Sequence, residues 1–161
     1  MPEALTAISN TSPLLYLHRI GQIQVLRRLY GLVCATTQVV AELAAGGLDV
    51  PGIDAVGWLE IRDVRIPETL RLVPDLGAGE ASSIALALEI GSSSLLLLDD
   101  RLGRRIAGLA GLSITGTAGI LVRAKQKGLV PAVRPLLEEL LRAGFHLRAD
   151  HVSDICRLAG E

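Results

Sequence analysis

The strongest constraint on the fold is a run of four leucines, Leu95 to Leu98, that ends in two adjacent acids, Asp99 and Asp100. A short continuous apolar run preceded by a glycine and three serines is typical of a strand buried on both faces of a parallel α/β sheet. In open sheets of this kind, ligands bind beyond the carboxyl ends of the strands. The sequence therefore predicts that Asp99 and Asp100 lie where ligands bind.

Two interpretations of this acid pair follow from its position. Close like charges disfavour ionisation of each other, so two adjacent carboxylates remain charged only beside a positive partner, of which a divalent metal ion is the simplest. Alternatively, one acid caps a helix that begins at Arg101 and the other is solvated. The spacing leaves both interpretations open, and the position of other acids must decide between them.

Strands and helices are predicted to alternate along the chain. Stretches of the kind that form short strands occur at 5–9, 32–35, 58–61, 95–98 and 111–115. Helical patterns occur at 13–20, 23–29, 38–45, 101–108, 117–127, 130–143 and 149–158, and a further helix leads from the Asp75–Glu80 segment to Ile90. Residues 67–74 are expected to form a loop, and 49–65 is the least regular part. Such alternation requires crossover connections and predicts a mostly parallel sheet covered by helices.

Length and composition favour a single domain over residues 1–161. Half of the residues are hydrophobic but only 2% are aromatic, so the core must consist mainly of aliphatic side chains. No apolar run reaches the roughly 20 residues that span a bilayer, and the first residues do not resemble a signal peptide, so we expect no membrane association and a cytoplasmic location. Neither the two cysteines nor the three histidines show the spacing of a metal site, and we expect them to be structural or surface residues.

The charges are distributed unevenly, although the net charge is only −1. No acid occurs between Arg101 and Leu137, an interval that holds Arg101, Arg104, Arg105, Arg123, Lys125, Lys127 and Arg134. A basic segment directly after an acid pair suits a polyanionic substrate, because the arginine fork matches phosphate. For any single arginine, a solvated surface position is the simpler interpretation.

Glu80 is the most informative acid outside the pair. Helical geometry places it within about a quarter turn of Ile84, Ala87 and Leu88, whereas Glu89 lies on the opposite face. A carboxylate on a buried face needs a partner, which is an arginine, a backbone group or a metal ion, and we favour the metal. Glu80 and Glu42, on an earlier helix, are expected to lean over the sheet edge where Asn10, Asp99, Asp100 and Thr115 end their strands.

Five short motifs, taken in order, resemble the PIN-domain superfamily and more closely its prokaryotic branch called domain of unknown function 3368. They are Asn10-Thr11-Ser12-Pro13-Leu14, Val40-Ala41-Glu42-Leu43, Gly77-Ala78-Gly79-Glu80-Ala81, Leu98-Asp99-Asp100-Arg101 followed by Gly103-Arg104, and Thr115-Gly116-Thr117. The resemblance covers nearly the whole chain. It implies a three-layer α/β/α fold with a central, mostly parallel sheet.

The resemblance also implies a function. PIN domains of this kind are ribonucleases that use Mg²⁺ or Mn²⁺, and many are toxins of toxin–antitoxin pairs that form homodimers. The expected partners are thus an RNA substrate, an antitoxin protein and a second copy of the chain. The implied catalytic residues are Asn10, Glu42, Glu80, Asp99 and Asp100, of which all except Glu42 are expected to bind the metal, with spacing leaving open which aspartate is the ligand. The expected substrate contacts are Thr11, Ser12, Arg101, Arg104, Thr115 and Thr117.

Asn10 departs from the family pattern, which has an aspartate after the first strand. An amide offers an oxygen to a metal but no charge, so metal affinity is expected to be lower. The main alternative is therefore a catalytically inactive PIN-like module that binds nucleic acid or a protein. A phosphoacceptor receiver domain fits less well, because receivers carry their acid pair after the first strand, where this chain has Asn10.

Overall fold

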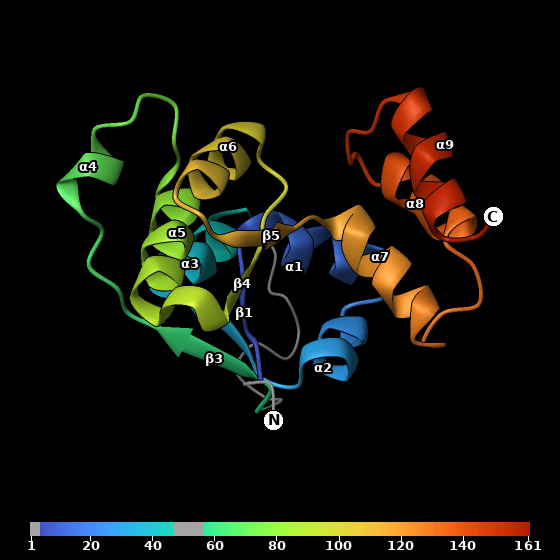
Figure 1. The fold of residues 1–161 in the computed structure, drawn as a ribbon, viewed down its shortest axis with the longest axis horizontal. Helices are drawn as coiled ribbons and strands as arrows, with labels where there is room; N and C mark the ends of the chain where they lie inside the picture. Colours follow the sequence, from blue (N-terminus) through green and yellow to red (C-terminus); the bar gives the residue numbers. More distant parts are fainter. Residues whose placement is uncertain (1–3, 47–56) are drawn as a thin grey trace.

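The protein folds around a five-stranded sheet in which every pair of neighbouring strands is parallel, so the predicted parallel sheet is confirmed (Figure 1). The computed structural model describes residues 4–46 and 57–161, which leaves part of the irregular 49–65 segment outside the described residues. The strand order is β3-β2-β1-β4-β5. The strands are β1 (Thr6–Ser9), β2 (Val33–Thr36), β3 (Leu59–Arg62), β4 (Ser94–Leu97) and β5 (Ser113–Thr115).

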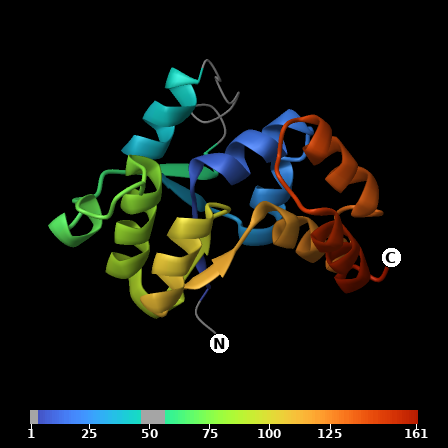
Figure 2. The same ribbon diagram turned by 90° about the horizontal axis from the view of Figure 1, so that it is seen from above.

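Helices cover both faces of this sheet and give the expected three-layer α/β/α fold (Figures 1 and 2). They are α1 (Thr11–Arg19), α2 (Gln24–Tyr30), α3 (Thr37–Ala45), α4 (Glu68–Arg71), α5 (Ala78–Ile90), α6 (Arg101–Leu109), α7 (Thr117–Gln126), α8 (Arg134–Arg142) and α9 (Ala149–Leu158). Seen from above, α1 lies between α5 and α6 on one side and α8 and α9 on the other. In the part of the chain that the structure describes, no helix combines the length and hydropathy needed to cross a membrane.

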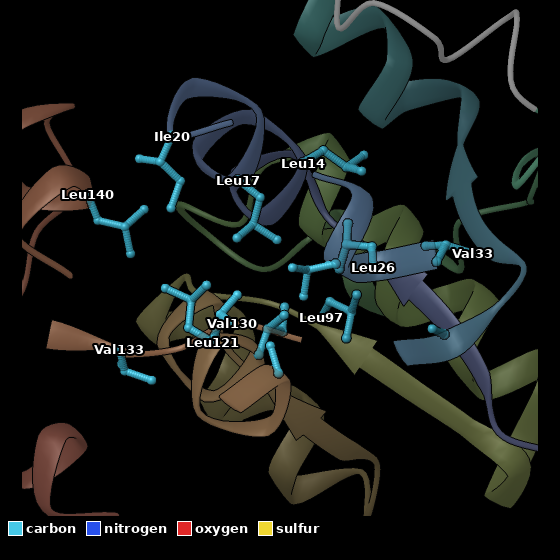
Figure 3. Packing of buried hydrophobic residues seen from close by; sticks show 14 of the residues in the cluster. Leu14, Leu17, Ile20, Leu26, Val33, Leu97, Leu121, Val130, Val133 and Leu140 are labelled. Atoms are coloured by element: carbon cyan, nitrogen blue, oxygen red, sulfur yellow. The ribbon is translucent and has the colours of Figure 1, made fainter. Parts of the chain in front are cut away.

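The leucine run separates two hydrophobic clusters. Leu97 packs with Leu14 and Leu121 in the cluster beneath α1, α2 and α7, as Figure 3 shows. Leu96 and Leu98 face the opposite side and belong to the cluster around α5. All three leucines of the run named here are completely buried, which confirms the prediction of a strand with two buried faces.

Three details of the predicted elements are wrong, each for a local reason. The expected loop at 67–74 contains α4, because Leu70 is buried against α5 and fixes a short turn of helix. The helix expected from Val130 begins at Arg134, so that Pro135 lies in the first turn, where its missing N–H has no helical partner to lose. Leu88, expected on the apolar stripe of α5, is 45% exposed, since buried residues surround the helix only as far as Ala87.

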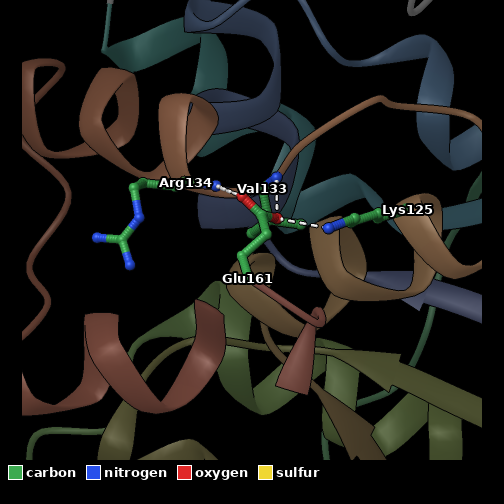
Figure 4. Close-up of polar contacts among 4 residues, drawn as sticks. All are labelled: Lys125, Val133, Arg134 and Glu161. Carbon is green, nitrogen blue, oxygen red and sulfur yellow. Dashed lines mark hydrogen bonds and ion pairs between the residues drawn. The ribbon is translucent and has the colours of Figure 1, made fainter. Parts of the chain in front are cut away.

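Glu161 holds the start of α8 to the end of α7 (Figure 4). Its carboxylate accepts hydrogen bonds from the backbone N–H of Val133 at 2.6 Å and of Arg134 at 3.1 Å. It also accepts one from Lys125 Nζ at 3.0 Å. The backbone bond from Val133 is the main reason that the pKa of Glu161 falls from its ordinary value of 4.5 to about 2, and Arg134 and Lys125 lower it further.

We predict that Glu161→Ala lowers the melting temperature at neutral pH and that this difference vanishes in acid. A group whose pKa falls on folding stabilises the protein fully above its unfolded pKa, and that stabilisation is lost as the pH falls from about 4.5 to about 2. Thermal unfolding of both proteins between pH 7 and pH 2, followed by circular dichroism, measures the difference. Glu138→Ala, at an exposed position of α8, is the control. A difference that stays constant across this range would contradict the assignment.

Candidate active site at the carboxyl edge of the sheet

The site lies where the sheet changes its winding direction. The strand β1 has β2 on one side and β4 on the other, and in open α/β sheets such a switch point leaves a crevice at the carboxyl ends of the strands. Asn10 directly follows β1, and its backbone N–H donates to the carbonyl of Leu97 at 2.9 Å. Asp99 follows the neighbouring strand. The predicted meeting of strand-end polar residues at one edge is therefore observed.

A cleft of about 1180 Å³ lies over this edge. Of the site residues expected from the sequence, those that line it are Asn10, Thr11, Ser12, Glu42, Glu80, Asp99, Asp100, Arg101, Arg104 and Thr115. Thr117 does not line it and is completely buried. The remainder of the wall includes Leu15 and Tyr16 of α1 and the stretch from Phe145 to Arg148, with His151 beside it. The predicted residues thus converge on one cleft, apart from Thr117.

Neutral donors fix the carboxylate of Asp99. Its Oδ1 accepts the backbone N–H of Thr117 at 2.7 Å. Its Oδ2 accepts the hydroxyl of Thr117 at 2.5 Å and that of Ser12 at 2.9 Å. Thr117, expected to contact substrate, is instead used to position Asp99. Asp99 is therefore held in position by neutral donors, with no cation bonded to it among the described residues.

Asp100 has a different role in the structure. It is the N-cap residue of α6, and its Oδ2 accepts the backbone N–H of Gly103 at 2.7 Å. The capping interpretation of the acid pair therefore holds for Asp100, whereas Asp99 faces the site. The structure thus distinguishes the positions of Asp99 and Asp100, which their spacing in the sequence left open.

The two helical acids are also held by neutral groups. Glu42 accepts the hydroxyl of Thr11 at 2.6 Å and the backbone N–H of Gly79 at 2.8 Å. Glu80 accepts Nδ2 of Asn10 at 3.2 Å, so its partner is an amide rather than an arginine or a backbone group. Asn10 is 1% exposed, and its Oδ1 has no hydrogen-bond partner among the described residues. A buried acceptor without a partner is uncommon in folded proteins and is typical of a functional site.

Three glycines leave room for the acids. A methyl group at Gly79 would collide with the carboxylate of Glu42, and one at Gly77 would collide with that of Glu80. A methyl group at Gly116 would lie 2.8 Å from both Oδ1 of Asp99 and Nη1 of Arg104. The glycines of the Gly77-Ala78-Gly79-Glu80 and Thr115-Gly116-Thr117 motifs thus leave space for the ends of the acid side chains, which a methyl group there would displace.

The donor set fits a hydrated hard cation but does not form a closed cage. Within residues 4–46 and 57–161, no group of three or more Asp, Glu, His or Cys side chains is positioned to hold a metal ion. Of the residues expected to bind the metal, Asp100 uses one oxygen to cap α6, and Asn10, Glu80 and Asp99 are the others. The unpartnered Oδ1 of Asn10, together with Glu80 and Asp99, offers only oxygen atoms. Mg²⁺ commonly binds through one or two carboxylates and keeps several waters, so this set is compatible with it.

Sequence reasoning missed one side of the cleft. His146 and His151 were expected to be ordinary surface or structural residues, but both line the cleft. They lie far along the chain from the acids and follow no recognisable spacing, so only the folding of the segment between α8 and α9 over α1 brings them there. The two cysteines, by contrast, are buried as expected, Cys34 and Cys156 lying in different hydrophobic clusters.

We predict that Asp100→Ala lowers the free energy of unfolding by about 1 kcal/mol, the usual cost of losing an N-cap. Asp100→Asn should retain most of the stability, because asparagine caps helices about as well as aspartate. Urea unfolding of the three proteins measures both effects. Equal destabilisation by the two substitutions would show that the charge of Asp100, rather than its capping bond, matters.

The comparison with known families agrees with this geometry. The profile of a family described as "DUF3368: PIN domain" matches residues 6–161, which is nearly the whole chain. No curated protein and no solved structure matched the sequence. The chain belongs to the DUF3368 family of PIN domains.

Proposed function

We propose that the protein is a metal-dependent endoribonuclease and the toxin component of a type II toxin–antitoxin system. PIN domains are generally nucleases. The observation that carries the proposal is the convergence of Glu42, Glu80 and Asp99 with Asn10 on one cleft at the switch point of the sheet. Arginines at the same cleft give it groups that bind phosphate.

In this proposal, Oδ1 of Asn10 and the carboxylates of Glu80 and Asp99 hold a Mg²⁺ or Mn²⁺ ion. When bound, such an ion lowers the pKa of its water and neutralises charge on a phosphodiester. Thr117 and Ser12 position Asp99 for this purpose through three hydrogen bonds. The ligands are therefore oriented by the surrounding chain before any cation arrives.

The two helical acids, Glu42 and Glu80, differ in how many of their oxygens already accept a hydrogen bond. Both oxygens of Glu42 already accept hydrogen bonds, from Thr11 and from Gly79. Glu80 accepts one from Asn10 through Oε1, and its other oxygen, which has no donor among the described residues, is the one left for the cation. Arg101 is exposed at the cleft and is assigned to the phosphate, where it offsets charge as the bond breaks. Arg104 is oriented by its bond to the carbonyl of Leu98 at 3.0 Å.

The biological part of the proposal rests on the family. A toxin of this type acts on RNA in the cytoplasm, pairs with an antitoxin protein and forms a homodimer. Expression of the chain alone should then arrest growth, and co-expression of its antitoxin should relieve the arrest. Growth without any effect would contradict the toxin assignment while leaving the nuclease assignment to be measured separately.

One observation favours a second candidate, a catalytically silent module that binds nucleic acid or a protein. Asn10 removes a negative charge from the cation site, and the described acids are not assembled into a ready metal cluster. Such a module would bind RNA in the cleft without cleaving it. The cleavage assay below distinguishes the two candidates.

We predict that the native protein cleaves a mixed pool of structured and single-stranded RNA with Mg²⁺ or Mn²⁺, and that EDTA abolishes cleavage. Asp99→Asn and Glu80→Gln should each reduce the rate about 100-fold or more, since each removes a carboxylate proposed to hold the cation that neutralises charge on the phosphate. Glu89→Gln is the matched control, because Glu89 lies exposed on the same helix as Glu80. Native protein that is inactive with both metals would support the silent module.

We predict that Asn10→Asp makes the melting temperature of the protein depend more strongly on bound metal. In place of the bond from Nδ2 to Glu80, the substitution sets two carboxylates against each other, which lowers the melting temperature in EDTA. Added Mn²⁺ should restore the loss and raise the melting temperature more than in the native protein, because a ligand that binds the folded state stabilises it. The same increase in both proteins would show that residue 10 does not contact the cation.

A further inference from the structure

We infer that Tyr16, Phe145, His146 and His151 form a wall of the cleft and that an unpaired base of the substrate stacks on its two exposed imidazoles, His146 and His151. This assignment rests on the proposed function and deepens it, since it makes the preferred substrate a single-stranded segment. These four residues are called the ring wall below. All of them line the cleft that holds the acids.

The aromatic and imidazole rings of the chain are concentrated at this cleft. The sequence has one Trp, two Tyr, one Phe and three His, and four of these seven rings line this one cleft. The fully buried large side chains of the core are leucine and isoleucine, and Tyr16 and Phe145 are only partly buried against it. Flat side chains are therefore concentrated at the place where a base would lie.

Contacts between α1 and the turn after α8 hold Tyr16 and Phe145 in place. The rings of Tyr16 and Phe145 meet edge to face, with centroids 5.1 Å apart and planes at 77°. Arg19 lies 5.3 Å from the centroid of the Tyr16 ring and donates to the carbonyl of Ala143 at 3.2 Å. The Tyr16 hydroxyl donates to the carbonyl of Gly144 at 3.4 Å. The turn after α8 is therefore attached to α1, and it presents the next residue, His146, to the cleft.

The imidazoles of His146 and His151 are both available to contact a base. His146 and His151 are exposed, and neither ring makes a hydrogen bond or an ion pair within the described ranges. Arg148, the cation of this segment, pairs instead with Asp150 at 2.9 Å. The ring wall therefore offers flat faces rather than a free cation.

The two sides of the cleft consequently differ in chemistry. The acids come from the strand ends and from α3 and α5, and the exposed arginines Arg101 and Arg104 come from α6, whereas the rings come from α1 and the 145–151 segment. A nucleotide with its phosphate at the acidic side and its base against the rings satisfies both. A base within a duplex already has neighbours on both faces, so only an unpaired base can stack in this way.

Fluorescence anisotropy in EDTA tests the assignment, because it measures binding without cleavage. The probes are a labelled single-stranded RNA of about eight nucleotides, a length typical of such binding sites, and the same backbone with abasic residues in the middle. His146→Ala and His151→Ala should each weaken binding of the ordinary RNA about fivefold or more, the usual effect of losing one stacked base. Their effect on the abasic RNA should be small. His18→Ala, which removes the remaining histidine of the chain and lies outside the cleft, is the matched control.

Two substitutions separate stacking from charge. His146→Phe keeps a flat ring and should retain the preference for the ordinary over the abasic RNA, whereas His146→Lys keeps only a positive charge and should lose it. Native protein that binds neither RNA in EDTA overturns this assignment, and the cleavage assay with Mg²⁺ or Mn²⁺ decides separately whether the proposed function also fails. Native protein that binds RNA overturns the ring wall alone if the alanine variants bind normally, or if they weaken both RNAs equally.

Discussion

The register between β1 and β4 determines where every other part of the site lies. Ser9 is opposite Leu97 in this register, and the next residues along each strand lead directly to Asn10 and Asp99. The register is fixed by burial, since Leu97 fills one hydrophobic cluster and its neighbours Leu96 and Leu98 fill the other. A shift of one residue would exchange the two faces and put each leucine in the wrong cluster. The apolar packing of one strand therefore sets the spacing of the polar edge.

The sequence predicts the parts of this structure that depend on local pattern. The leucine run, the strand ends and Glu80 opening its helix are all visible as periodicity or as punctuation by glycine. Features that depend on contacts between distant residues are not visible in this way. Asp99 and Asp100 are adjacent in the sequence, and their hydrogen bonds distinguish them, since Thr117 and Ser12 donate to Asp99 and Gly103 donates to Asp100. The same holds for α4, which exists because Leu70 meets α5.

The acids at the edge are held by hydroxyl and backbone N–H groups and not by arginine or lysine. Glu42 and Asp99 each accept bonds from neutral donors only, and Glu80 accepts one from an amide. A neutral donor stabilises a carboxylate without cancelling its charge, whereas an ion pair would do both. Among the described residues these acids therefore bond to neutral groups, although Arg101 and Arg104 line the same cleft, and Asn10 lowers the repulsion that a further carboxylate would add.

The shape of the site depends in part on glycines, which have no side chain. Gly77, Gly79 and Gly116 each leave the volume of one methyl group to a functional side chain. In a survey of random variants, inactivating changes would therefore include substitutions that alter neither charge nor hydrogen-bonding capacity. A glycine-to-alanine change is usually regarded as mild, but at these positions it competes with an acid for the same space. The site thus depends on residues that take no part in the chemistry as well as on those that do.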